Sequence, residues 1–192
     1  MTAANCRCAK RVSGGNMATW NSRGLRGSSF EEMINMTNNV YKERGLAIIQ
    51  KIPTPITPVN LDKGKNVITL AYFEQKSTID YIGAAQGIPI CFDAKETKQG
   101  RLPLQNIHAH QVEFMEHFQK QGGVAFLLVH CADEEEYFFL PFEVLEKYWR
   151  AAQKGGRKSI PYSAFEKKYL IHNKNGCPVH YLEARHTYLM EE

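Results

Sequence analysis

The chain has 192 residues, of which 43% are hydrophobic and 23% charged, so it should fold around a core of its own. Its apolar runs fall short of the ~18 residues that a membrane-spanning helix needs, and its N-terminus lacks a stretch of the signal-peptide type. We therefore expect a cytoplasmic protein of one domain. The net charge of +4 is mildly basic and unevenly distributed, because the first thirty residues carry arginines and lysines and no acid.

The N-terminal segment, residues 1–27, is rich in Gly, Ser, Asn and Arg, a composition typical of a flexible segment. Such a tail is usually just a soluble, flexible segment without a binding role. In a nucleic-acid enzyme, Arg23 and Arg26 would instead bind phosphates, and each such contact adds salt-dependent affinity. We assign residues 28–192 to one folded domain.

A helix is expected to begin near Ser28, because Ser28-x-x-Glu31 and Ser29-x-x-Glu32 both match the capping box. Apolar residues follow at helical spacing, and Gly45 should end the helix. Glu31 or Glu32 is then either an additional active-site acid or a charge that favours the positive end of the helix dipole.

A protruding loop or ribbon is expected at residues 53–75, which follow a predicted strand at 46–50 and include a second predicted strand at Val67–Phe73. The prolines of residues 53–58 should break regular structure there and exclude a central sheet position. The segment is long for a connection in a compact domain, and it carries lysines rather than an apolar docking face. Taken alone, the pattern favours a floppy surface loop.

A strand at residues 90–95 carries the most informative pattern in the chain. Side chains alternate between the faces of a strand, so the apolar residues point one way while Asp93 and Lys95 point the other. Asp80 lies upstream, and residues 83–87 between the two acids read as a turn. A hairpin would bring the acids together, in the Asp-turn-Asp-x-Lys arrangement of metal-dependent nucleases.

This arrangement suits phosphodiester hydrolysis. Two carboxylates can hold Mg²⁺, which lowers the pKa of a bound water and polarises the phosphoryl oxygen. A fixed lysine charge beside the phosphate stabilises the transition state. An acid-x-Lys pair alone is more often a solvated salt bridge. Because Lys95 lies on the polar face, we expect its removal to cost activity and little stability.

A helix is expected from residue 104 to about residue 121, with Gln111 in the middle of its apolar stripe. A buried amide must find a partner or cost ~1–3 kcal/mol. Gln111 therefore either caps a buried backbone group or turns its carbonyl oxygen toward the acids to bind metal. The helical spacing leaves both readings open.

Farther along, strands are expected at residues 124–130 and 137–140, with an acidic turn between them. Pro141 should open a helix that ends at Gly155-Gly156. Arg157 and Lys158 follow, either as surface charge or as DNA contacts, and residues 161–192 carry little functional information. The five cysteines are an odd number without zinc-site spacing, and we expect all of them to be reduced.

Several short stretches in a specific order resemble one known family, over about residues 22–160. They are Ser22-Arg23-Gly24, Ser28-Ser29-Phe30-Glu31-Glu32, Lys51-Ile52-Pro53-Thr54-Pro55, Ala71-Tyr72-Phe73, Ser77-Thr78-Ile79-Asp80-Tyr81, Phe92-Asp93-Ala94-Lys95-Glu96-Thr97, Pro103-Leu104-Gln105-Asn106-Ile107-His108-Ala109-His110-Gln111 and Gly156-Arg157-Lys158-Ser159-Ile160. In these the chain is similar to the RecU-type Holliday junction resolvases, homodimeric enzymes of Gram-positive bacteria with a restriction-endonuclease-like fold.

The resemblance implies a role for each matching residue. Thr78, Asp80, Asp93 and Gln111 align with the family's Mg²⁺ site, and Lys95 with its catalytic lysine. Among these, the resemblance decides the reading of Gln111 in favour of the metal. Asp93 stands where the family usually has Glu, one methylene longer, which leaves the preference between Mg²⁺ and Mn²⁺ open.

The resemblance also implies that residues 53–75 form the stalk that enters the centre of a four-way junction. The candidate phosphate contacts of the stalk are Lys51, Lys63, Lys65 and Lys76. Candidate DNA contacts elsewhere in the chain are Arg23, Arg26, Arg157 and Lys158. The implied fold is a restriction-endonuclease-like α/β core, with a central mixed sheet flanked by helices, plus this stalk.

The implied function is Mg²⁺-dependent resolution of Holliday junctions by a homodimer, in DNA recombination and repair. The implied partners are four-way junction DNA and, for the family, recombinase and branch-migration proteins. Two alternatives stay open: a duplex or flap nuclease of the same fold, and a non-catalytic junction-binding protein. The stalk argues against the first alternative, and the presence of Asp80, Lys95 and Gln111 argues against the second.

Overall fold

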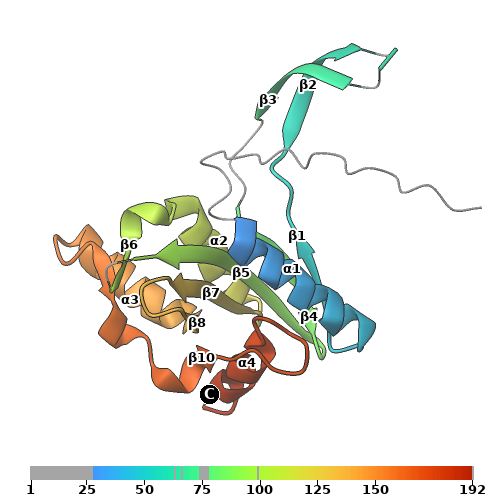
Figure 1. The fold of residues 1–192 in the computed structure, drawn as a ribbon. Coiled ribbons are helices and arrows are strands. Elements are labelled where there is room, and N and C mark those ends of the chain that lie inside the picture. The colour runs from blue at the N-terminus through green and yellow to red at the C-terminus, as the bar shows by residue number, and fades with distance from the viewer. Residues whose placement is uncertain (1–27, 63, 66, 74–77, 99, 192) are drawn as a thin grey trace, which may run out of the picture.

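The computed structural model describes residues 28–62, 64–65, 67–73, 78–98 and 100–191, which form a mixed α/β core and a projecting ribbon (Figure 1). None of the described helices is both long enough and apolar enough to cross a membrane. The elements are α1 (Ser28–Glu43), β1 (Ala47–Lys51), β2 (Ile56–Asp62), β3 (Val67–Phe73), β4 (Tyr81–Ala85), β5 (Ile88–Thr97), β6 (Arg101–Pro103), η1 (Leu104–Asn106), α2 (Ala109–Lys120), β7 (Val124–Cys131), β8 (Glu136–Pro141), α3 (Phe142–Gln153), β9 (Ser159–Pro161), η2 (Tyr162–Ala164), η3 (Lys167–Tyr169), β10 (Leu170–Ile171) and α4 (Tyr181–Leu189).

The central sheet is mixed, as expected from the sequence, and has the strand order β1-β4-β5-β7-β8-β10. Strands β5 and β7 are parallel, and the other neighbouring pairs are antiparallel. A parallel pair needs a crossover between its strands. The segment with β6, η1 and α2 supplies this crossover, and it thereby brings the start of α2 next to β5.

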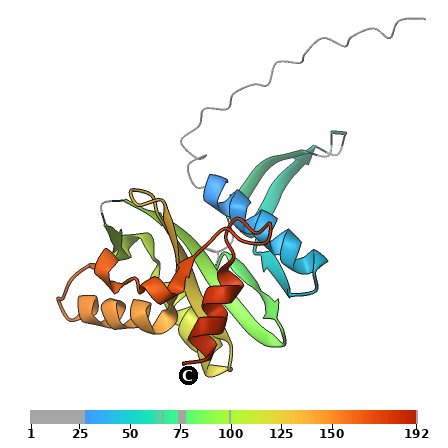
Figure 2. The same ribbon diagram turned by 60° about the horizontal axis from the view of Figure 1, so that its bottom comes forward.

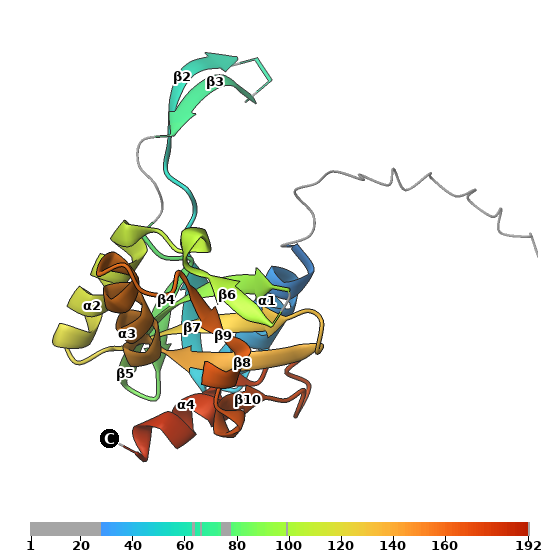
Figure 3. The same cartoon turned by 90° about the vertical axis from the view of Figure 1, so that its left-hand side faces the viewer.

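Helices cover both faces of the sheet. Side chains of α1 and α4 form one core with Phe92 and Phe126, and those of α2 and α3 form the other core with Cys91 and Leu127. Figure 3 shows α2 and α3 on one side of the sheet and α1 on the other. Strand β7 is buried on both faces, and its sequence is close to a continuous apolar run.

The alternation along β5 is confirmed. Ile88, Ile90, Phe92 and Ala94 belong to the core beside α1 and α4, whereas Asp93 and Lys95 lie on the face that α2 covers. That second face is not solvent, however, since the exposed fraction of Asp93 is 0%. The carboxyl group of Asp93 is therefore buried between β5 and the first turn of α2.

The ribbon of β2 and β3 pairs only with itself and projects from the core (Figures 1 and 3). Its register runs from Ile56 opposite Phe73 to Asp62 opposite Val67, with irregularities just after Pro58. The prediction that residues 53–58 lack regular structure was wrong for the last three of them. A two-stranded ribbon leaves one edge of each strand unpaired, and Pro58 is therefore tolerated without an N–H donor.

The ribbon also carries more apolar surface than the sequence analysis expected. Large apolar side chains stand exposed along both strands, and the prediction that this segment lacks an apolar docking face was wrong. They are exposed on both faces of the ribbon because none of the helices that the structure describes covers it. These side chains are Ile56, Val59, Val67, Ile68, Leu70 and Tyr72.

Two predicted boundaries also differ. The turn expected at residues 83–87 is shorter, because Gly83 lies within β4 and only Gln86 and Gly87 have positive φ. A Cβ on Gly83 would lie 2.0 Å from the carbonyl oxygen of Ile48 in β1, so glycine serves close strand approach here. The helix expected from residue 104 begins as the short helix η1, and α2 starts only at Ala109.

The C-terminal segment, which gave little functional information in the sequence, completes the core beside α1 (Figure 2). Its helix α4 buries Tyr181 and Arg185. The Arg185 guanidinium donates to the Ala85 carbonyl oxygen at 2.9 Å and to Gln86 Oε1 at 2.9 Å. This helix therefore anchors the β4–β5 turn, at the opposite end of β5 from the polar group described next.

Candidate active site

Asp80 and Asp93 meet where β4 begins. Asp80 directly precedes Tyr81, the first residue of β4, and Tyr81 pairs with Phe92 in β5. The backbone N–H of Asp80 donates to Asp93 Oδ1 at 2.8 Å, and the backbone N–H of Ala94 donates to Asp80 Oδ2 at 3.2 Å. The hairpin expected from the sequence thus brings the two carboxyl groups together.

Lys95 belongs to the same group. Its Nζ lies 2.5 Å from Asp93 Oδ2, and its side chain is 15% exposed. A fully buried carboxylate is costly unless it is paired and hydrogen-bonded, and Lys95 supplies the positive charge. The lysine is therefore mostly buried, with its ammonium directed at the buried acid.

Gln111 reaches Asp93 from the first turn of α2. Its Nε2 donates to Asp93 Oδ2 at 2.6 Å, while its Oε1 accepts a hydrogen bond from the backbone N–H of His108 at 3.0 Å. Both readings from the sequence are therefore partly realised, since the side chain caps the helix and also contacts an acid. The amide nitrogen, rather than the carbonyl oxygen, faces Asp93. To bind metal through oxygen, the amide must turn over and release His108.

The site carries excess negative charge. Burial, and next the charge of Asp93, raise the pKa of Asp80 to about 6 from an ordinary value of 3.8, while Lys95 acts in the opposite direction. Two carboxylates close together with one ammonium leave a net charge that a divalent cation would neutralise. This electrostatic imbalance is an observation in favour of a cation site.

The donor set fits Mg²⁺. The oxygens that meet here are the carboxylates of Asp80 and Asp93, with the amide oxygen of Gln111 nearby. Among the described residues no group of three or more His, Cys, Asp or Glu side chains gathers. Mg²⁺ prefers such hard oxygen donors and usually keeps several waters. Thr78, also proposed as a ligand, is exposed and lies two positions before Asp80 in the chain.

The other predicted contacts lie around this centre. Lys51 forms an ion pair with Glu31 of α1 at the base of the ribbon, so neither is an isolated charge. Lys65 is exposed at the far end of the ribbon, and Arg157 and Lys158 are exposed after α3. Four further candidates lie outside the described residues, and they are Arg23, Arg26, Lys63 and Lys76.

His108 is a supporting residue that the sequence analysis missed. It precedes α2 with extended backbone angles, and its N–H orients the amide of Gln111. The usual signal for such a position is Ser, Thr, Asp or Asn at the N-cap. A histidine there does not match that signal, although Gln three residues later does match the second half of a capping box.

Comparison with known proteins gives a family match over most of the chain. The family model described as RecU: Recombination protein U matches residues 25–187. The Holliday junction resolvase RecU of Oenococcus oeni is 41% identical over 159 residues, 81% of each chain. The protein of the same name from Ligilactobacillus salivarius is 47% identical over 147 residues, 74% of this chain and 68% of that one. That from Lactococcus lactis subsp. lactis is 45% identical over 165 residues, 83% and 76% of the two chains.

One solved structure also overlaps this fold. It is Archaeoglobus fulgidus Hjc, described as a Holliday junction resolvase from an archaeal hyperthermophile, with 11% identity and a TM-score of 0.40. The overlap covers 69% of this chain and 90% of that one. A likeness this distant supports no conclusion about the chemistry of the site.

Proposed function

This chain belongs to the Recombination protein U family, and from that premise we propose that it is a Mg²⁺-dependent endonuclease that resolves Holliday junctions in DNA recombination and repair. The observation that carries the proposal is the contact of Asp93 with Lys95 and Gln111, beside Asp80. Bacterial relatives carry the name Holliday junction resolvase. We place its action in the cytoplasm, where bacterial DNA is found.

We assign the metal ligands to Asp80, Asp93, Thr78 and the amide of Gln111. Bound Mg²⁺ would supply an activated water and polarise the phosphoryl oxygen, and Mn²⁺ is a possible substitute. Lys95 holds its ammonium against Asp93 and keeps 15% of its side chain exposed. From there it neutralises charge that develops on the phosphate in the transition state.

The projecting ribbon favours a branched substrate. A basic cleft is sufficient to hold linear duplex DNA, whereas a four-way junction has an open centre that a protruding ribbon can fill. Lys51 at the base of the ribbon and Lys65 at its far end would contact backbone phosphates of the DNA along the length of the ribbon. This geometry supports junction resolution over the duplex- or flap-nuclease alternative. The close contacts of Asp93 support a catalytic protein over a non-catalytic binder.

We further propose that the protein acts as a homodimer. The exposed apolar side chains of the ribbon, together with Ile48 of edge strand β1 at 69% exposure, form more apolar surface than isolated residues require. A two-fold dimer would bury this surface and place two sites for symmetric cuts in two strands. Contacts with recombinase and branch-migration proteins are a further part of the proposal.

The test is to incubate the purified protein with a synthetic four-way junction, a linear duplex and a flap of matched sequence. We expect paired, symmetric cuts in the junction when Mg²⁺ or Mn²⁺ is present and none in EDTA. The Asp80→Asn variant, purified in the same way, controls for contaminating nucleases. Equal cutting of duplex and junction would instead support the duplex-nuclease alternative, and junction binding without any cut would support the non-catalytic one.

A further inference from the structure

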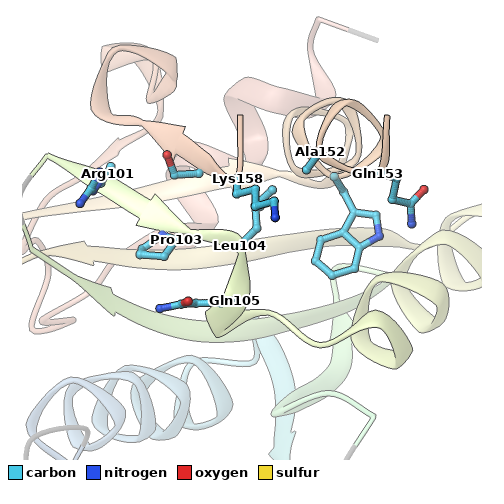
Figure 4. Close-up of a pocket in the computed structure, with 9 residues that line it drawn as sticks. Arg101, Pro103, Leu104, Gln105, Ala152, Gln153 and Lys158 are labelled. Carbon is cyan, nitrogen blue, oxygen red and sulfur yellow. The ribbon is translucent and has the colours of Figure 1, made fainter. Parts of the chain in front are cut away.

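A cavity of about 640 Å³ lies outside the group of Asp80, Asp93, Lys95 and Gln111 (Figure 4). Its walls come from β6, η1, the last turns of α3 and the segment that leads into β9. Figure 4 shows Arg101 and Gln153 at opposite ends, with Lys158 and Leu104 between them. The volume lies within the range of about 300–1,000 Å³ that is usual for small-molecule sites.

Regular structure holds the walls of this cavity in place. Strand β6 pairs with β9, from Arg101 opposite Pro161 to Pro103 opposite Ser159. The backbone N–H of Leu104 donates to the Lys158 carbonyl oxygen at 3.1 Å, which joins η1 to the segment after α3. Trp149 lines the cavity and packs partly against the core beside α2, so its position is set by the fold.

The cavity offers positive charge without a matching acid. Arg101 and Lys158 are both exposed, and within the described part of the chain neither forms an ion pair. Nearby Arg150, by contrast, is 2.5 Å from Glu146 on its own helix. Arg157 does not line the cavity but precedes Lys158, and its Nε donates to Oγ of the lining residue Ser159 at 3.1 Å. Such a surface complements a polyanion.

The cavity and the candidate active site share one continuous segment. Residues 104 and 105 line the cavity, and the same segment continues through His108 to Gln111. On the other side, β5 carries Lys95, and the hydroxyl of Thr97, two residues later on β5, donates to the Arg101 carbonyl oxygen in β6. The walls of the cavity are therefore joined to the elements that carry Lys95 and Gln111.

We propose that this cavity binds one nucleotide of the DNA strand near the cleaved phosphate, with its base against the indole of Trp149 and its phosphates between Arg101 and Lys158. The proposal rests on the proposed function, because it names a subsite for the same DNA substrate. Aromatic side chains bind bases by stacking, and every base presents a suitable face. The amides of Gln105 and Gln153, which also line the cavity, can donate to and accept from the base edge.

A branched substrate suits such a subsite. Taking a base out of an intact duplex costs unpairing and unstacking energy, and the cost is lower where pairing is already interrupted. Bases at the branch point of a four-way junction remain paired, but each arm ends there, so the stack on one side of the terminal pair is interrupted and the unstacking cost is lower. Trp149 would thus position the strand and contribute to the choice of cleavage position, while Asp80, Asp93 and Lys95 carry out the chemistry.

The experiment combines single abasic nucleotides in the junction with variants of the cavity. Each nucleotide around the cut is made abasic in turn, and both the dissociation constant in EDTA and the single-turnover cleavage rate with Mg²⁺ are measured. For the wild-type protein, we expect one abasic position to weaken binding by about 5- to 100-fold. Trp149→Ala should weaken binding of the intact junction to a similar degree and remove the sensitivity to that position.

Matched variants separate stacking from loss of fold. Trp149→Phe keeps an aromatic face and should restore most of the sensitivity, and Lys147→Ala, exposed on the same helix, should behave as wild type. Arg101→Gln and Lys158→Gln should each weaken binding at every position and reduce the salt slope by about 1.

The outcomes distinguish this proposal from the proposed function. If the wild-type protein does not cut or prefer the junction, the proposed function itself is wrong. If it cuts the junction but no abasic position affects it, or if every abasic effect adds independently to that of Trp149→Ala, the nucleotide subsite is overturned while the resolvase remains.

Discussion

Asp80 and Asp93 each bind the backbone of the other's strand: the Asp80 N–H donates to Asp93 Oδ1 at 2.8 Å, and Asp80 Oδ2 accepts from the Ala94 N–H at 3.2 Å. These bonds hold the carboxyl groups together although their charges repel each other. The repulsion is one reason that the pKa of Asp80 is raised to about 6. The fold therefore maintains an arrangement that a cation would stabilise.

The first prediction concerns charge at this pair. Asp80→Asn and Asp93→Asn keep an oxygen acceptor for the backbone N–H donors and remove one negative charge each. We expect cleavage to fall below about 1% of the wild-type rate, because the metal loses a ligand. Junction binding should persist, since phosphate contacts elsewhere dominate affinity. Normal cleavage by Asp93→Asn with Mg²⁺, in a junction assay, would contradict the mechanism.

The second prediction concerns pH. Because the folded-state pKa of Asp80 lies above its ordinary value, the fold disfavours the charged form, and stability from this group is lost as pH rises from about 4 to about 6. In EDTA near neutral pH, Asp80→Asn should therefore be about 1–3 kcal/mol more stable than wild type. Below pH 4 the difference should vanish. Thermal unfolding across this range measures it, and a destabilised Asp80→Asn at neutral pH would contradict the prediction.

The third prediction concerns Lys95. Lys95→Ala should lose about 10²–10³ in cleavage rate, comparable with removal of one transition-state donor. Its polar position alone suggested little effect on stability, but Asp93 is fully buried and would lose its cation. We therefore expect a loss of up to about 3 kcal/mol by chemical denaturation. The double variant Lys95→Ala/Asp93→Asn should be less destabilised than Lys95→Ala alone, and strict additivity of the two changes would refute the coupling.

The fourth prediction concerns the length of residue 93. Asp93→Glu adds one methylene, so that the carboxylate extends farther from β5. Mg²⁺ requires near-ideal octahedral geometry at short distances, so ligand reach should affect it strongly. We expect half-maximal cleavage at a lower Mg²⁺ concentration and a higher ratio of Mg²⁺- to Mn²⁺-supported rates. Direct titration of metal binding provides a second measurement, and Asp80→Glu serves as the control that should not show this gain.

The fifth prediction concerns the ribbon. Replacing residues 56–70 with a short Gly-Ser turn should leave the core and the acidic site intact, because β2 and β3 pair only with each other. Junction binding and resolution should fall sharply, while weak binding to linear duplex remains. Loss of the exposed apolar side chains should also lower self-association, measured by light scattering. Equal junction preference before and after the deletion, in a gel-shift assay, would favour a duplex nuclease.

Much of the core could be predicted from the sequence, because its signals are local. Capping residues and helical spacing located α1 and α3, and alternation in β5 separated Phe92 from Asp93. The strand β7 was recognisable as an apolar run. The role of helix α4 was not predicted, because it depends on contacts between distant parts of the chain. Arg185 of this helix binds the β4–β5 turn, which lies about a hundred residues away in the sequence.

The candidate site could be predicted from the sequence only in part. The residue types, their order and the resemblance were sufficient to propose Asp80, Asp93, Lys95 and Gln111, and their metal-binding roles remain predictions. The orientation of Gln111 was not accessible, because it depends on the His108 N–H at the start of α2. A local pattern indicates on which face of a helix or strand a side chain lies, but not which hydrogen-bond donor it will contact on that face.

The sequence by itself was sufficient to propose the chemistry of the site and to identify the family: it has Asp93 and Lys95 on one strand face, Asp80 on the preceding segment of the same hairpin, and a long lysine-bearing insertion. The tertiary structure alone decided that Asp93 is fully buried, that the ribbon exposes apolar side chains, and that Trp149 lines a basic cavity. The physical reason is the separation along the chain over which each kind of interaction acts. Periodicity and capping act over a few residues, whereas burial and charge balance depend on which distant segments cover a side chain.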